Sequence, residues 1–141
     1  HIELRTVLTA RNVMELPSLA KFVSLNLPFI DYWAIMAMEP IGYAKANKAE
    51  LFFDHSLFPE PLTATLDYAQ NSNLQVALYN FPLCTIPKKY RSFCSQSISD
   101  WKRKYVEECY DCSEKEVCTG FFEWYTPEWK WEGVHSLSGE A

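Results

Sequence analysis

Three cysteines stand within ten residues of this 141-residue chain, and their spacing constrains the fold more than any other feature. Cys109, Cys112 and Cys118 form the pattern C-x₂-C-x₅-C, in which a short turn directs two thiols at one centre and a further turn returns a third. A tetrahedral site needs a fourth ligand, which Cys84 or Cys94 must supply from a distant loop. Thiolates favour zinc, copper(I) or iron–sulfur clusters. The spacing therefore predicts a metal or cluster site.

Two other uses of these cysteines compete with a cluster. Disulfides are disfavoured because the number of cysteines, five, is odd and would leave one unpaired. The chain also has no recognisable signal peptide, and its hydrophobic content of 48% is enough for an ordinary core. A structural zinc site stays open. The usual zinc ribbon has a second C-x₂-C pair, and its absence here favours the cluster.

The first two thirds of the sequence alternate between strand and helix patterns. Residues 2–8, 29–38 and 74–79 are short apolar runs typical of buried strands. Pro17 and Pro61 each suit the first turn of a helix, and these helices are expected to end near Asn26 and Asn71. Strands separated by helices predict an α/β fold with a parallel sheet and at most three βα units. A complete (β/α)₈ barrel needs roughly 200 residues or more, so the segment would be an arc of one.

A further helix is predicted after Tyr79, where the chain otherwise becomes irregular. Ser97 followed by Asp100 is a variant of the capping box, and one helical face would then carry Ile98, Trp101 and Tyr105. Asp100 is interpreted as a cap partner, and Trp101 as packing beside the metal centre.

Charge and composition exclude several classes of function. The net charge of −5 and pI near 5.2 disfavour binding to nucleic acid or anionic lipid. No apolar run is long enough for a membrane span, and no signal peptide is recognisable, so we expect a cytoplasmic protein. The four glycines form no phosphate-binding loop, and no nucleophile elbow supports a hydrolase.

Several segments resemble the C-terminal part of radical S-adenosylmethionine (SAM) enzymes, closest to the His-Xaa-Ser system radical SAM maturase. The segments that carry the resemblance are YNFPLC at 79–84, SISDWK at 97–102 and the stretch from Cys109 to Phe122. Residues 4–8, 26–29 and 38–44 are similar to later barrel strands of that family. The resemblance implies an enzyme that modifies a peptide or small protein.

The same resemblance implies a division of the chain. Residues 1–81 would be the C-terminal part of a TIM-type barrel, residues 82–122 a SPASM-like region, and residues 123–141 an aromatic tail. The SPASM-like region would hold one auxiliary [4Fe–4S] cluster through Cys84, Cys109, Cys112 and Cys118. A SPASM extension usually has another cysteine where this chain has Phe122, so one cluster is expected. Cys94 is the substitute candidate for Cys84.

The SAM-cleaving loop C-x₃-C-x₂-C does not occur in these 141 residues. We therefore expect the chain to be the C-terminal portion of a larger enzyme, with SAM as cofactor of the full-length protein and its N-terminal half as partner. Charged groups at barrel strand ends can face the cavity, which makes Arg5 a candidate for the SAM carboxylate and Glu39 for another polar group. Alternatively, Arg5 pairs with Glu3. The competing function is a zinc-stabilised Cys₄ binding module without catalytic activity.

Histidine and tryptophan side chains are assigned structural positions. His1, His55 and His135 show no ligand spacing and are expected at the surface. The tail tryptophans are expected to pack against the fold rather than grip a peptide; they are Trp124, Trp129 and Trp131.

Overall fold

The computed structural model describes residues 1–139 and contains one four-stranded parallel sheet in the order β1-β2-β3-β4. The strands are β1 (Glu3–Leu8), β2 (Tyr32–Ala37), β3 (Val76–Tyr79) and β4 (Cys94–Ser95). The α-helices are α1 (Leu16–Asn26), α2 (Gly42–Ala46), α3 (Lys48–Leu51) and α4 (Glu60–Asn71). Short 3₁₀ turns cover Val13–Glu15, Leu83–Thr85, Lys88–Phe93, Asp100–Lys102, Glu107–Cys109 and Pro127–Trp129. The α/β class and the parallel sheet agree with the sequence.

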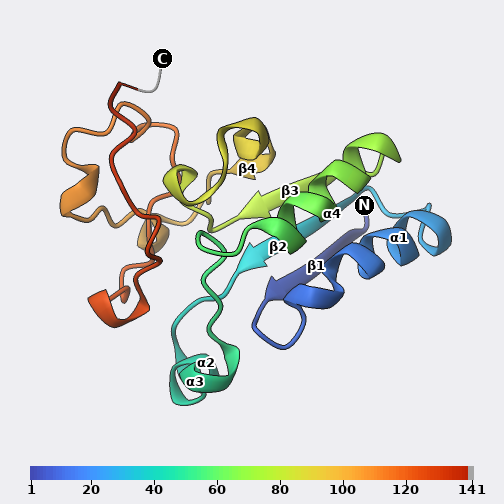
Figure 1. The fold of residues 1–141 in the computed structure, drawn as a ribbon, viewed down its shortest axis with the longest axis horizontal. Coiled ribbons are helices and arrows are strands. Elements are labelled where there is room, and N and C mark those ends of the chain that lie inside the picture. The colour runs from blue at the N-terminus through green and yellow to red at the C-terminus, as the bar shows by residue number, and fades with distance from the viewer. Residues whose placement is uncertain (140–141) are drawn as a thin grey trace.

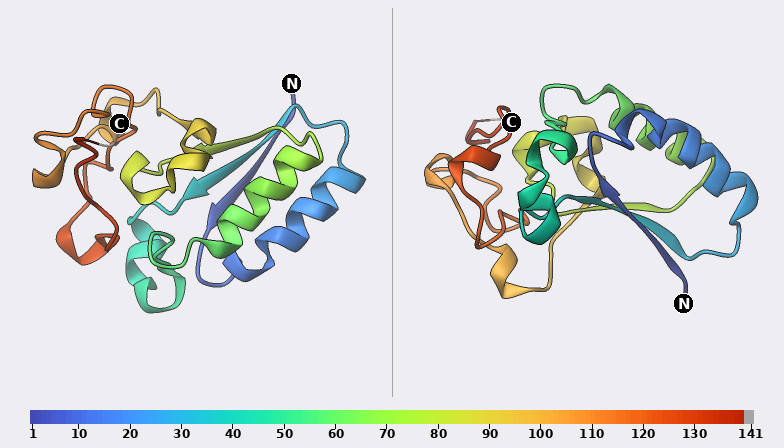
Figure 2. Two further views of the ribbon diagram at one scale, coloured as in Figure 1. Left: turned by 45° about the horizontal axis from the view of Figure 1, so that its top comes forward. Right: turned by 90° about the horizontal axis from the view of Figure 1, so that it is seen from below.

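The two long helices cover one face of the sheet (Figures 1 and 2). Pro17 and Pro61 lie in the first turns of α1 and α4, where the missing N–H costs no helical hydrogen bond. Each helix buries an apolar stripe. The buried residues are Leu16, Ala20 and Val23 in α1, and Leu62, Thr65, Leu66 and Ala69 in α4.

The pleat of the strands divides their side chains between the two faces of the sheet. Trp33, Ile35 and Leu78 are fully buried among the helix stripes, and the indole N–H of Trp33 donates to Thr6 Oγ1 at 2.9 Å. Arg5 and Val7 point to the opposite face and are exposed. One face of the sheet is therefore left without a helical layer.

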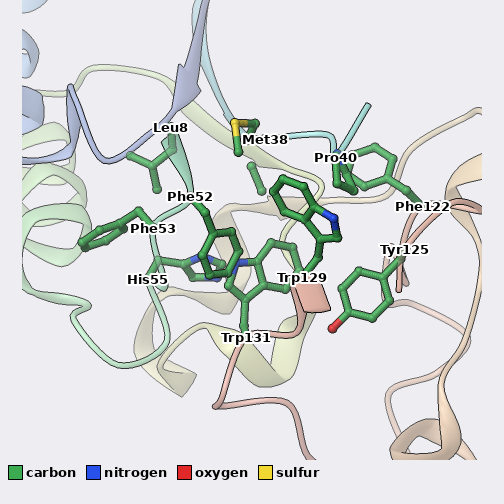
Figure 3. A pocket seen from close by; sticks show the side chains of 11 residues that line it. Leu8, Met38, Pro40, Phe52, Phe53, His55, Phe122, Tyr125, Trp129 and Trp131 are labelled. Carbon is green, nitrogen blue, oxygen red and sulfur yellow. The ribbon is translucent and has the colours of Figure 1, made fainter. Parts of the chain in front are cut away.

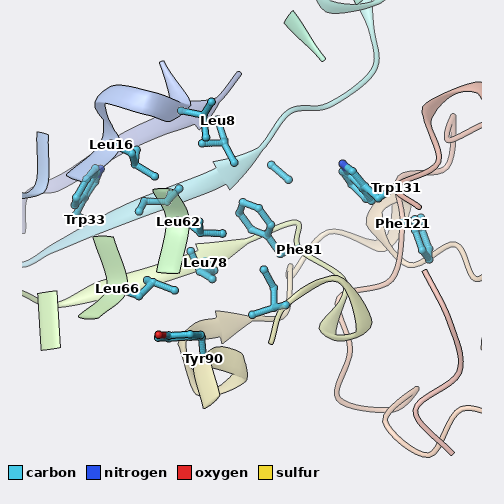
Figure 4. Packing of buried hydrophobic residues seen from close by; sticks show 14 of the residues in the cluster. Leu8, Leu16, Trp33, Leu62, Leu66, Leu78, Phe81, Tyr90, Phe121 and Trp131 are labelled. Atoms are coloured by element: carbon cyan, nitrogen blue, oxygen red, sulfur yellow. The ribbon is translucent and has the colours of Figure 1, made fainter. Parts of the chain in front are cut away.

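The chain after Tyr79 lies at the carboxyl ends of the strands (Figure 1). It shares one hydrophobic core with the sheet, because Phe121 and Trp131 belong to the same buried cluster as Leu8 and Phe81 (Figure 4). The three segments 1–81, 82–122 and 123–139 are thus packed together.

Two sequence predictions about this region are wrong. The expected helix after Ser97 is only the 3₁₀ turn Asp100–Lys102, since Ser97 Oγ accepts the N–H of Ser99 instead of capping a longer helix. Lys104 then pairs with Phe121 in an antiparallel bridge, which fixes the backbone in a non-helical course. Trp101 is 52% exposed and so does not provide buried cover beside the cysteines.

Candidate metal centre

Four of the five cysteines line one small pocket, here called the cysteine pocket. Cys84 comes from the turn after β3, and Cys109, Cys112 and Cys118 come from the irregular segment that follows β4. The space between the side chains is about 10 Å³, room for about one water. The apolar lining consists of Pro82, Leu83, Phe121 and Leu137.

Short backbone turns place these thiols. The N–H of Cys112 bonds to the carbonyl of Cys109 at 3.3 Å, which closes the C-x₂-C turn. The N–H of Cys118 bonds to Glu114 O at 2.9 Å and turns the chain back toward the pocket. Cys84 sits in the 3₁₀ turn Leu83–Thr85, directly after Pro82. Two loops separated by more than twenty residues in sequence therefore meet at one place.

The sulfur of Cys118 accepts two backbone N–H groups. Leu83 N and Gly120 N both lie 3.4 Å from Cys118 Sγ. Such bonds stabilise a thiolate and influence the potential of an iron–sulfur centre. The Leu83 bond also ties the loop of Cys84 to the loop of Cys118.

The electrostatics of the pocket require a cation if all four thiols ionise. Burial raises the pKa of Cys84 to about 11, and the neighbouring Cys118, Cys109 and Cys112 add to the rise. Burial likewise raises the pKa of Cys109. A bound metal supplies the positive charge that deprotonates ligating thiols. Without such a charge, burial favours the neutral thiol form of Cys84 and Cys109. The chemical type of the four donors, though not their arrangement, is that of a thiolate-held inorganic centre.

The thiols do not stand at metal-binding positions as they are. Within residues 1–139, no group of three or more His, Cys, Asp or Glu side chains is arranged so that it could hold a metal ion. The space between the side chains is also small, about 10 Å³, so a bound centre would require these side chains to move.

Cys94 occupies a different position. It forms β4 opposite Leu78 and does not line the cysteine pocket. Burial raises its pKa to about 12, and Cys118 is the one cysteine that contributes to this rise. Cys94 packs against the buried cluster of Leu83, Cys118 and Leu137, as Cys84 and Cys112 also do. Of the two candidates for the fourth ligand, Cys84 is the one that lines the cysteine pocket.

Arg5 and Glu39 are not brought together. Arg5 Nε lies 2.6 Å from Glu3 Oε1, and Glu3 also accepts the hydroxyl of Tyr32. Arg5 lines a hollow of about 360 Å³ on the uncovered face of the sheet. It pairs in register with Ala34, five residues before Glu39, and Glu39 does not line this hollow.

His55 contradicts the expectation of a surface position, because it is only 2% exposed. Its ring packs edge-on against Phe81, with ring centroids 4.8 Å apart. The centroid of the Trp131 ring lies 5.0 Å away (Figure 3). His55 Nε2 is 2.8 Å from Thr85 Oγ1, whose own proton is donated to Pro82 O. His55 Nε2 therefore carries the hydrogen and supports the turn that holds Cys84. No ligand-like spacing marked this residue in the sequence.

The aromatic tail packs against the carboxyl ends of the strands, as expected. Trp129 and Trp131 are buried, and with Leu8, Met38 and Phe52 they line an apolar pocket between the tail and strands β1 and β2 (Figure 3). Two buried polar atoms in the tail have no hydrogen-bond partner, Trp124 Nε1 and the hydroxyl of Tyr125.

Across residues 1–139, every helix is too short or too polar to cross a membrane. Comparisons with family models, with curated proteins and with solved structures find no match to this chain.

Proposed function

We propose that this chain is the C-terminal portion of a radical SAM enzyme that modifies a peptide or small protein and carries an auxiliary [4Fe–4S] cluster. Cys84, Cys109, Cys112 and Cys118 would be the ligands. The observation that carries the proposal is the meeting of these four thiols, from two separate loops, in one pocket. The N-terminal portion would contribute SAM cleavage.

The sheet supports a partial TIM-type barrel. Its strands are parallel, its two long helices α1 and α4 lie on one face, and the other face carries a polar hollow. In a barrel this uncovered face would be the interior, where ligands bind near the carboxyl ends of the strands. Arg5 lines the hollow and stays the candidate for the SAM carboxylate, whereas the position of Glu39 gives its candidacy less support.

The border formed by β1 and α1 supports the presence of further βα units. β1 is an edge strand of the four-stranded sheet. Phe22 and Leu25 on α1 are 54% and 67% exposed. Parallel sheets are normally covered on both faces and paired along their length, so an exposed edge beside an apolar helix face fits another strand with its crossover helix.

The residues around the pocket have separate tasks in this proposal. The four thiolates hold the cluster, which when bound supplies one-electron transfer. With all four cysteines as ligands, no iron is left open to substrate, so the centre would act through electron transfer or by stapling the loops. Leu83, Phe121 and Leu137 exclude water, and the N–H groups of Leu83 and Gly120 stabilise the Cys118 thiolate.

A zinc-stabilised Cys₄ module is the second candidate. The tight turn between Cys109 and Cys112 suits two ligands of one zinc ion as well as two ligands of a cluster. The two candidates differ in the inorganic element and in redox behaviour.

Iron and acid-labile sulfide analysis of anaerobically purified chain tests the proposal. We expect about four iron atoms and four sulfides per chain, and a brown colour that dithionite bleaches. Cys84→Ser should lose most of the iron, while Cys94→Ser should keep it and serves as the matched control for loss of a buried thiol.

Other outcomes contradict the proposal in distinct ways. A colourless chain with about one zinc after anaerobic preparation favours the binding module. Iron retained in Cys84→Ser and lost in Cys94→Ser would assign the fourth ligand to Cys94. Aerobic samples do not decide between the metals, because oxidation can remove iron and admit zinc.

A further inference from the structure

Residues 135–137 of the aromatic tail lie over the cysteine pocket and are here called the flap. His135 and Leu137 both line that pocket. Leu137 is only 1% exposed, and its side chain packs in a small buried cluster with Leu83 and Cys118. The red part of the tail accordingly runs beside the orange segment that carries three of the cysteines (Figures 1 and 2). The flap therefore closes one side of the pocket.

The residues just before the flap are fixed to the rest of the fold and are here called the anchor. The N–H of Glu132 bonds to Asp54 Oδ2 at 2.8 Å, and the N–H of Gly133 bonds to Ser56 Oγ at 2.8 Å. A Cβ at Gly133 would stand 2.5 Å from the Cβ of Ser56, so only glycine lets the chain lie this close. Val134 is buried in the main hydrophobic core. The anchor thus holds the tail in place up to the start of the flap.

Leu137 packs in a cluster that is separate from the main core. The main core contains the helix stripes, the strands and the tail up to Val134, whereas Leu137 belongs to the small cluster with Cys118. The carbonyl of Leu137 accepts the hydroxyl of Ser113 at 3.2 Å. Release of the flap therefore breaks contacts of the small cluster and keeps those of the main core. Segments whose buried contacts are few can open in this way without unfolding the protein.

A solvent-open hollow of about 660 Å³ borders the flap, and Gly133, His135 and Cys84 are among the residues that line it. His135 and Cys84 also line the cysteine pocket, where the space between the side chains is only about 10 Å³. The two spaces therefore share a wall that the flap helps to form. Movement of the flap would join them and give the buried thiols a path to solvent.

We propose that residues 135–137 are a flap that opens from the anchor and controls the access of thiol-seeking ions and electrophiles to Cys118 and the cysteine pocket. Withdrawal of the Leu137 side chain would also supply room that the closed pocket lacks. The inference goes beyond the proposed function, because it holds for any ion or reagent that binds or modifies thiols.

Alkylation of the reduced, metal-free chain by iodoacetamide tests the flap at Cys118, which is 9% exposed. The thiolate displaces iodide, and mass spectrometry after digestion identifies the labelled residue. In Leu137→Ala the contacts that hold the flap closed are weaker, so the initial labelling rate at Cys118 should rise about thirtyfold or more. Hydrogen exchange of the β2 amides, measured on the same samples, reports unfolding of the whole protein.

Leu19→Ala is the matched control, because Leu19 lies on α1 and packs against the main core. This substitution lowers the stability of the whole fold but does not change the balance between closed and open flap. Exchange of the β2 amides should therefore become faster, whereas the labelling rate at Cys118 should equal that of the unaltered chain.

Ser113→Ala is a milder second variant, which removes only the hydrogen bond to the carbonyl of Leu137. The labelling rate at Cys118 should rise about twofold to tenfold in this variant. It keeps the test open if Leu137→Ala fails to fold.

Three results overturn the proposal. Unchanged labelling of Cys118 in the Leu137 and Ser113 variants would show that the flap does not cover this thiol. Labelling and β2 exchange that accelerate equally in Leu19→Ala would show that the thiol is reached only by unfolding of the whole protein. Labelling of the unaltered chain as fast as in urea would show that nothing protects Cys118. None of these results depends on iron content, so failure of the flap and failure of the proposed function are distinguishable.

Discussion

At the scale of single residues, His55 shows how burial controls charge in this molecule. It lies between aromatic rings, and burial lowers its pKa from 6.5 to about 4. The nearby carboxylate of Asp54 opposes this shift but does not cancel it. The folded protein therefore holds His55 neutral at a pH where an unfolded chain already binds the proton.

This predicts a loss of stability in mild acid. Below about pH 6.5 the unfolded state takes up a proton that folded His55 refuses, so the free energy of unfolding falls as the pH approaches 4. The full effect is about 3 kcal/mol. Urea unfolding at pH 7, 6 and 5 should show this decline.

His55→Phe provides the comparison. The variant keeps an aromatic ring at the site, and the Thr85 hydroxyl keeps its bond to Pro82 O. Its stability should vary less than that of the unaltered chain between pH 7 and pH 5. Parallel curves for the two proteins would show that His55 is not the responsible group.

At the scale of elements, the turn at Gly120 joins the cysteine loop to the aromatic tail. Gly120 has φ of +67°, and an added Cβ would stand 2.8 Å from Lys104 O. The same glycine donates its N–H to Cys118 Sγ and precedes the bridge between Phe121 and Lys104. A side chain here would disturb the turn, the bridge and a sulfur hydrogen bond together.

Gly120→Ala should therefore lower the free energy of unfolding by more than the cost of placing an alanine in a left-handed backbone conformation. Gly42→Ala is the control, since Gly42 also has positive φ, at +54°, but open space around it. We expect a cost of about 1–2 kcal/mol at Gly42 from the left-handed backbone alone. At Gly120 the cost should be larger by at least about 1 kcal/mol. Equal losses in denaturant unfolding would contradict the account of this turn.

The elements that the sequence predicts well are those whose pattern repeats. The α1 and α4 stripes recur at helical spacing and begin at Pro17 and Pro61, and the three apolar runs are strands. β4 is only Cys94–Ser95, too short to show alternation. The expected helix after Ser97 fails because two of its three apolar side chains find no buried position: Ile98 is 97% exposed and Trp101 is 52% exposed.

The candidate site was partly predictable for the same reason. The C-x₂-C-x₅-C spacing is local, and the turns that bring its thiols together are local as well. The arrival of Cys84 and the burial of His55 and Tyr125 depend on contacts between segments far apart in sequence. No spacing rule within one segment could indicate those contacts.

At the scale of the whole molecule, the border of β1 and α1 predicts self-association of the chain. An unpaired strand edge beside exposed Phe22 and Leu25 invites contact with another chain. The double variant Phe22→Asp, Leu25→Asp should sediment with a smaller fraction of oligomer than the unaltered chain.

Lys21→Glu, an exposed charge change on the same helix, is the control for altered net charge. It should leave the oligomer fraction as it is. A monomeric unaltered chain at high concentration would show that this border does not need a partner.

X-ray absorption spectroscopy of the anaerobic protein shows whether sulfur atoms from two distant loops hold an iron centre. We expect an iron edge whose first shell is all sulfur, followed by an iron–iron shell, with both shells lost in Cys84→Ser. A zinc edge with a sulfur shell and no metal–metal shell, in protein kept free of oxygen throughout, would contradict it.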